Sequence, residues 1–337
     1  MINFKFLIDM KKFSIIGILF PFLIIFIVSC NDEWKDELYS HYVSFKAPIN
    51  SKGVTDIYVK YMKDSLSTYQ LPLIVSGTTT NSKNLNVKVA LDIDSLNTLN
   101  YERFQNRKDL YFTPLDKLFY DIPSYAVTIP SGSRQALFPI NFSFEKIDMF
   151  HKWVLPLTIV DDDPQANYNA NPRKHYRKAM LRVIPFNDYS GTYQTTAMRI
   201  YFKGTNTNAL VINNRTTSVV DENTIFFYAG ATDEDDKNRN IYKIKARFNR
   251  DGTLNMYVED ERINFQLLQT PRYTIEENMD DLLPYLKHRY ITINLSYLYD
   301  DITSVPGVSI SYEVKGSMIM ERKINIQIPD EDQAIEW

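Results

Sequence analysis

Residues 85–93, LNVKVALDI, indicate the fold class because apolar side chains recur at every second position. In a β-strand alternate side chains point to opposite faces, so Leu85, Val87 and Val89 would share one face with Leu91 and Ile93. Residues 55–61 (TDIYVKY) show the same period, and turn-forming Gly, Ser and Asn separate such segments. Half-buried strands of this kind predict an antiparallel sheet.

Further strands are expected on both sides of this segment, at 42–45, 68–75, 125–129, 136–144, 153–159 and 179–185, with one short helix at 96–106. Trp153 lies in phase with the apolar residues of its strand and is assigned to the core. Many short strands joined by turns are typical of an immunoglobulin-like β-sandwich. We expect this domain to span residues 41–186.

The second half begins after the turn-rich residues 187–191 (NDYSG) and contains another series of strands. These are expected at 198–202, 209–212, 218–220, 224–228, 241–248, 254–259, 289–299, 308–314 and 316–327, with a short helix at 278–287. The Asp251-Gly252 pair indicates a β-hairpin. The chain is therefore predicted to be all-β, with the sandwich followed by an antiparallel β-barrel, or a second sandwich, at 187–337.

The first thirty residues have the pattern of an export signal. Three lysines precede an apolar run at 13–28, which is shorter than the roughly 20 residues that a membrane-spanning helix needs. The chain's only cysteine, Cys30, follows this run directly, an arrangement that resembles the bacterial lipobox. The resemblance implies a signal peptide at 1–29, lipidation of Cys30 and a tether at 30–40. The alternative is a signal anchor with an incidental cysteine.

The acidic residues after the cysteine, 31–37 (NDEWKDE), resemble the surface-export signal of Bacteroidota lipoproteins. This resemblance predicts a protein held in the outer membrane by its lipid and facing the cell exterior. The formal net charge of −3 argues against a nucleic-acid partner, which would require basic clusters. Because Cys30 is the only cysteine, the mature chain has no internal disulfide.

The sequence contains no HExxH metalloprotease motif, P-loop, nucleophile elbow or GxGxxG motif, and the four histidines show no metal-ligand spacing. We therefore expect no catalytic residue, metal or cofactor. Two alternatives stay open. Glycosidase carboxylates need only meet in space, so a hydrolase is one alternative. Asp161, Asp162 and Asp163 offer hard oxygen ligands suited to calcium, but the loop lacks the other features of an EF-hand.

Sugar binding usually combines flat aromatic faces with amide, carboxylate and guanidinium groups. Two segments predicted to lie in loops or near turns contain such combinations. The candidate ligand-binding residues are Tyr168, Asn171, Arg173 and Tyr176 in the first segment, and Tyr273, Tyr285 and Arg289 in the second.

The final residues 321–337 (ERKINIQIPDEDQAIEW) resemble the closing signature of a Bacteroidota lipoprotein family, and residues 125–159 resemble its N-terminal domain. That family joins an immunoglobulin-like domain to a β-rich C-terminal domain of unknown function. Its association with glycan-utilisation genes implies a non-catalytic accessory role, with a polysaccharide or oligosaccharide and a TonB-dependent transporter complex as partners. The alternative is a structural or adhesion lipoprotein that docks on an outer-membrane complex. Asp64-Ser65-Leu66 and Asp94-Ser95-Leu96 also resemble bacterial O-glycosylation sites.

Overall fold

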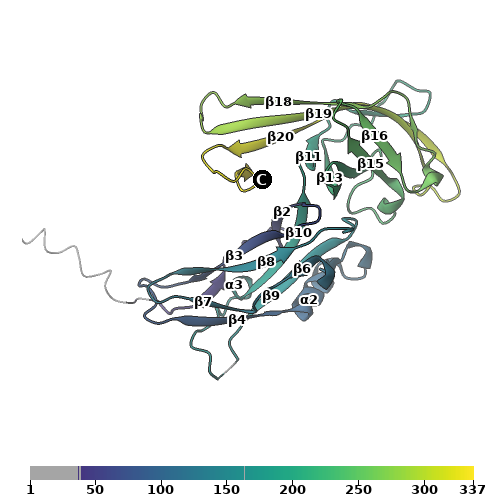
Figure 1. Cartoon of the computed structure of the whole chain (residues 1–337). Helices are drawn as coiled ribbons and strands as arrows, with labels where there is room; N and C mark the ends of the chain where they lie inside the picture. The colour runs from purple at the N-terminus through teal and green to yellow at the C-terminus, as the bar shows by residue number, and fades with distance from the viewer. Residues whose placement is uncertain (1–36, 38, 163) are drawn as a thin grey trace, which may run out of the picture.

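The computed structural model describes residue 37, residues 39–162 and residues 164–337 (Figure 1). The chain is all-β, as predicted: an N-terminal sandwich precedes a nearly closed C-terminal antiparallel barrel. Cys30, the signal peptide and most of the expected tether lie outside the described residues. Within the described residues, every helix is too short or too polar to cross a membrane.

Two sheets form the N-terminal sandwich. The first has the order β1 (Val43–Phe45), β3 (Ser67–Val75), β8 (Gln135–Phe142) and β6 (Tyr120–Asp121). The second has the order β2 (Thr55–Lys60), β10 (Lys178–Phe186), β9 (Lys152–Val160), β4 (Leu85–Leu91) and β7 (Ala126–Ile129), with β5 (Phe112–Pro114) beside β9. The β2–β10 and β5–β9 pairs are parallel, so the expectation of purely antiparallel pairing is wrong for these two pairs.

The sandwich core follows from the alternation in the sequence. Leu85, Val87 and Val89 of β4 are buried as predicted and share a core with Leu71 and Phe138 of the other sheet. Leu91 and Ile93, which were predicted to share this buried face, do not, because β4 ends at Leu91 and Ile93 begins a helix. Both side chains are exposed.

Helix α2 (Ile93–Phe104) confirms the predicted helix but starts three residues early. The carboxylate of Asp92 accepts a hydrogen bond from the backbone N–H of Ser95 at 3.0 Å, which is a helix N-cap. Trp153 is partly buried against the sandwich core, where the sequence placed it. The remaining helical elements are short: α3 (Lys174–Arg177), η1 (Lys108–Leu110), η2 (Lys117–Phe119), η3 (Arg239–Tyr242) and η4 (Glu261–Ile263).

One eleven-stranded sheet curls into the C-terminal barrel. Its main order is β16 (Leu254–Val258), β15 (Lys243–Phe248), β14 (Thr224–Tyr228), β13 (Asn214–Asp221), β11 (Gly191–Gln194), β20 (Ile310–Asn325), β19 (Leu286–Asp301) and β17 (Gln266–Leu267). Strands β12 (Arg199–Phe202) and β21 (Ile335–Glu336) also pair with β20, and β18 (Arg272–Met279) pairs with β19. A bridge between Thr253 and Arg272 brings the two ends of the sheet together. Tyr193, Ile291 and Met318 fill the interior.

Two predicted elements of this domain, the helix at 278–287 and the strand at 209–212, are wrong. No helix occurs at 278–287, because β18 and β19 form a long hairpin there. Asp280 closes the hairpin turn by accepting from the N–H groups of Leu282 and Leu283, both at 2.8 Å. The segment 209–212 is a loop with a single bridge to β12.

The strands expected at 308–314 and 316–327 are one continuous strand, β20. Gly316 does not end it, because its φ of +131° and missing Cβ let the strand pass the backbone of Ala197. A Cβ at this position would overlap the Ala197 carbonyl oxygen. The predicted Asp251-Gly252 hairpin, by contrast, is confirmed between β15 and β16, and Gly252 has a φ of +81°.

Candidate functional site

The first predicted ligand group does not form a binding surface as a unit. The side chain of Tyr168 is buried, and its hydroxyl bonds the carbonyl oxygen of Val160 and the N–H of Lys88. Asn171 holds the loop by donating to the Ser44 hydroxyl at 3.0 Å and accepting from the Arg173 N–H at 3.0 Å. Only Arg173 and Tyr176 present exposed side chains.

The second group is spread along the β18–β19 hairpin. Tyr273 packs edge-on against Phe248, and its hydroxyl donates to the carbonyl oxygen of Asn249 at 2.8 Å. Tyr285 is half-buried in the hairpin turn. Arg289 pairs across the strands with Glu277, four positions from Tyr273, which is roughly 13 Å along a strand. The structure therefore does not bring these three residues together.

A cavity of about 490 Å³ lies instead at the junction of the two domains. The sandwich contributes residues of β2, β9 and β10, and the barrel contributes β11, β13, β14 and β20. The C-terminal segment 335–337 also lines it. This position between two domains, and a mixture of aromatic and polar lining, are common features of ligand sites.

The last residue of the sequence forms an aromatic wall of this cavity. Pairing of β21 with β20 brings the chain end back toward the sandwich. There the ring of Trp337 stacks on Tyr58, with centroids 4.0 Å apart and an interplanar angle of 2°. Phe186 meets the Trp337 ring edge-on at 4.7 Å, and the Arg322 guanidinium lies 5.5 Å from its centroid. Sequence reasoning missed Trp337 as a lining residue, since only the docking of the two domains gives it neighbours.

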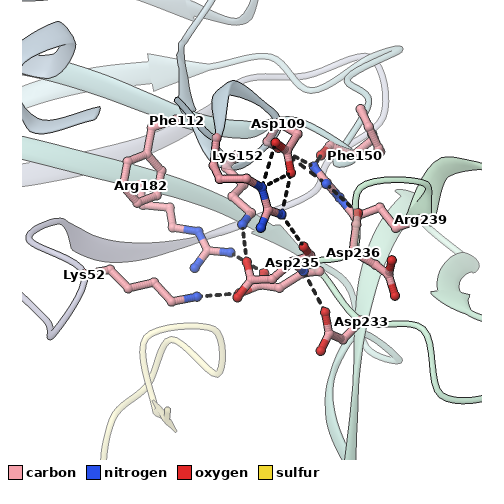
Figure 2. A network of polar contacts seen from close by, with 12 residues as sticks. Lys52, Asp109, Phe112, Phe150, Lys152, Arg182, Asp233, Asp235, Asp236 and Arg239 are labelled. Atoms are coloured by element: carbon pink, nitrogen blue, oxygen red, sulfur yellow. Dashed lines mark hydrogen bonds and ion pairs between the residues drawn. The ribbon is translucent and has the colours of Figure 1, made fainter. Parts of the chain in front are cut away.

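Ion pairs hold the cavity walls together. An acidic loop of the barrel, residues 233–236, reaches basic side chains of the sandwich (Figure 2). Glu234 binds Lys52 at 2.5 Å and Arg182 at 3.1 Å, and Asp235 binds Lys152 at 2.7 Å. Burial would raise the pKa of Glu234, but the charges of Arg182 and Lys52 outweigh it and lower that pKa to about 2.

Aromatic contacts reinforce these pairs. The Arg239 guanidinium of the barrel lies 4.3 Å from the ring centroid of Phe150 in the sandwich. The buried Lys243 bonds Asp148 at 2.9 Å, again across the domain boundary. The cavity is thus formed by side chains that also fix the two domains to each other. The acidic residues 233–236 and the basic residues of the sandwich are visible in the sequence, but their pairing across the junction is not.

Four neutral polar residues, Thr192, Asn214, Thr216 and Ser218, line the barrel side of the cavity, and we call them the neutral strip. Thr192 of β11 pairs directly with Thr216 of β13. The alternate residues of β13, Arg215 and Thr217, are buried. The strip therefore lies on the outer face of the barrel, toward the sandwich.

No group of three or more His, Cys, Asp and Glu residues suited to a metal occurs in the part of the chain that the structure describes. Asp161, considered above for calcium, instead bonds Arg177 at 2.6 Å and the Ala170 N–H at 3.1 Å, and Asp163 lies outside the described residues. His288 lies between Glu321 at 2.6 Å and Asp280 at 3.0 Å. The protonated His288 ring donates to the carboxylates of Glu321 and Asp280, and these hydrogen bonds, with Glu321 contributing most, raise the pKa of His288.

Comparison with known proteins gives the relatives of this chain. A family model described as a domain of unknown function (DUF4973) matches residues 34–164, and a model of a C-terminal domain matches 177–319. A Bacteroides ovatus protein of unknown function is 46% identical, with 88% of this chain and 100% of that chain covered and a TM-score of 0.79. This chain belongs to the same protein family as that Bacteroides ovatus protein, and its residues 34–164 match the DUF4973 model.

Other solved structures extend the comparison for this chain. An auxiliary nutrient binding protein from Bacteroides thetaiotaomicron is 40% identical, with 89% of this chain and 100% of that chain covered and a TM-score of 0.79. A second Bacteroides ovatus protein of unknown function is 36% identical, with 86% of this chain and 95% of that chain covered and a TM-score of 0.76. No curated protein matches the chain. These relatives agree with the predicted Bacteroidota family, while its lipoprotein character and glycan-locus association stay predictions.

Proposed function

We propose that this chain is a lipid-anchored accessory protein of the cell surface that binds a glycan, without catalysis, in the cavity between its domains. The observation that carries the proposal is the cavity itself, which has the half-exposed rings of Tyr58 and Trp337 on one wall and the neutral strip on another. Flat rings pack against the apolar faces of sugars, and hydroxyl and amide groups bond sugar hydroxyls.

The relative described as an auxiliary nutrient binding protein supports an accessory role in nutrient capture, since the two chains match over nearly their whole length. The lipobox-like Cys30 and the acidic residues behind it support anchoring in the outer membrane with the cavity outside the cell. A TonB-dependent transporter complex is the proposed protein partner, to which the captured glycan would pass.

Glu234, one of the carboxylates that line the cavity, supports the proposal of a non-catalytic role. Glycosidases need one carboxyl group that stays protonated near neutral pH to serve as the acid. Glu234 is paired with two basic side chains, and its pKa of about 2 keeps it ionised. Incubation with a glycan panel should therefore release no sugar, and release would establish a hydrolase instead.

Calorimetric titration of purified residues 31–337 with a panel of oligosaccharides tests the proposal. We expect saturable binding to at least one glycan. Absence of binding to every glycan, repeated with the transporter present, would refute it. Labelling with a radioactive fatty acid tests the anchor: the wild-type chain should incorporate label and the Cys30→Ala variant should not.

A second candidate function, docking on a membrane protein complex, has its own supporting observation. Strand β18 pairs with β19 along its length, while its other edge contacts the described strands through a single bridge at Arg272. Ile275 and Met279 are each 46% exposed, and Leu282 at the turn is 88% exposed. Unpaired edges and exposed apolar side chains favour protein contacts. Recovery of a transporter on immobilised protein, unchanged by glycan, would favour this function.

A further inference from the structure

We infer that the cavity takes an uncharged oligosaccharide, and not an acidic or sulfated one. The inference rests on the proposed glycan-binding function and narrows its ligand class. It follows from which polar groups of the cavity are already bonded and which are free.

The charged side chains that line the cavity balance one another, with five Lys and Arg residues and five Asp and Glu residues. Two of the basic groups have carboxylate partners from the acidic loop, Arg182 with Glu234 and Lys152 with Asp235. Recruiting either one to an anionic ligand would break an ion pair between the domains. Removing one partner of a buried or half-buried pair is costly.

The other three basic groups are bonded to carbonyl oxygens. Arg322 donates to the carbonyl oxygens of Asn187, Asp188 and Ser190 at 2.8–3.2 Å. Arg215 donates to those of Gly230 and Thr232 from the inner face of the barrel, and its unbonded Nε is shielded from solvent. Arg239 donates to Asp236 at 3.0 Å. Every Lys and Arg side chain on the described cavity wall is therefore already held by a protein acceptor, with which a sulfate or a carboxylate would have to compete.

The neutral strip, in contrast, is free. Its four side chains have no hydrogen-bond partner among the described residues, while lining the cavity. Asn214, Thr216 and Ser218 are spaced two residues apart on one strand, so the three span roughly 13 Å. That length exceeds a single sugar ring. Hydroxyl and amide groups both donate and accept, which matches the hydroxyls of an uncharged sugar.

An open stretch of strand edge adds neutral backbone groups beside the strip. Strand β20 pairs with β11 only at Ile319 and with β21 from Lys323 onward. Residues 320–322 lie between these points, where no other described strand pairs with that edge, and all three line the cavity. Backbone N–H and C=O groups there are suited to hydroxyls or to an acetamido group of a sugar. None of them selects for negative charge.

The test is calorimetric titration of residues 31–337 with neutral oligosaccharides of glucose, mannose, xylose and N-acetylglucosamine, and with polygalacturonate and sulfated oligosaccharides. We expect binding to a neutral member, with a Kd that changes less than about twofold between roughly 0.05 and 0.5 M NaCl, because salt screens charged contacts only. The double variant Asn214→Ala/Thr216→Val should bind at least tenfold more weakly. The matched control Thr274→Val/Asn278→Ala, at exposed positions on β18, should bind like the wild type.

The possible outcomes separate the inference of an uncharged ligand from the proposed glycan-binding function. Binding restricted to acidic or sulfated glycans, weakened by salt, would overturn the inference and leave the proposed glycan-binding function standing. Neutral binding that the Asn214→Ala/Thr216→Val variant retains in full would show that the cavity strip is not the site, and so would overturn the inference too. Failure to bind every member of the panel would overturn the proposed function itself.

Discussion

Replacing Glu234 by Gln tests whether the acidic loop couples the two domains. The pKa of this carboxylate is lowered from its ordinary 4.5 to about 2 by Arg182 and Lys52, against the effect of burial. A shift of this size corresponds to about 3 kcal/mol at most. Because the side chain is 38% exposed, solvent screening reduces the expected loss of unfolding free energy to about 1–2 kcal/mol at pH 7.

The lowered pKa of Glu234 also determines how the unfolding free energy changes with pH. A carboxylate with a lowered pKa stabilises the folded state above pH 4.5, and this stabilisation is lost as the pH falls toward 2. Urea unfolding followed by tryptophan fluorescence should therefore show a difference between wild type and Glu234→Gln that is complete at pH 7 and less than half as large at pH 3. Trp153 and Trp337 both line the domain junction and report its opening.

Glu276→Gln is the matched control, since Glu276 is an exposed residue of the same domain without an ion-pair partner among the described residues. It should change the unfolding free energy by less than about 0.5 kcal/mol. A Glu234→Gln effect as small as this control, or one that stays constant from pH 7 to pH 3, would refute the account of the acidic loop.

Three further predictions concern single positions. Gly230→Ala should lower the unfolding free energy measured in urea by about 2–4 kcal/mol, because φ is +55° and the new Cβ would overlap the Tyr299 ring. The control Gly132→Ala, where φ is +79° and the space is open, should lower it by only about 1 kcal/mol. Equal losses would contradict the argument. The pKa of His288 is raised in the folded state, so the protonated ring stabilises the fold fully below pH 6.5, and this stabilisation is lost as the pH rises through the folded-state pKa. His288→Asn should therefore lower the unfolding free energy by about 0.5 kcal/mol at pH 6 and by less at pH 9.5. If the chain is O-glycosylated in its native host, peptide mass spectrometry should find sugar on the exposed Ser65 and not on Ser95, which is 8% exposed and bonded to Lys178; sugar on Ser95 would contradict this.

The sequence predicted those parts of the fold that depend on local patterns. Alternation at 85–89 and the Asp251-Gly252 pair each require only neighbouring residues, and both predictions are confirmed. The prediction divided this region into strands 308–314 and 316–327, whereas Gly316 lies inside one continuous strand and lets the Ala197 backbone approach it. The segment 278–287 was predicted to be a helix, whereas the chain turns there from β18 into β19 and leaves Leu282 and Leu283 exposed at the turn.

The cavity could not be predicted in the same way. Tyr168 was expected to contact ligand because its loop is polar, yet its hydroxyl finds backbone partners inside the sandwich. Trp337 acquires Tyr58 as a neighbour only after β21 pairs with β20 and the domains dock. Thr192 and Thr216 are unremarkable strand residues until the sandwich lies opposite them. The stacking of Trp337 on Tyr58 joins residues 279 positions apart, and no local pattern records such a contact.

The most direct test of the central claim is hydrogen–deuterium exchange of residues 31–337 with and without the tightest-binding oligosaccharide. The account predicts slower exchange in segments 190–194, 214–218 and 320–322, which line the cavity. It predicts no change in loop 164–178 or in the β18–β19 hairpin. Protection in either of those segments, with none around the cavity, would contradict the claim that the glycan binds between the domains.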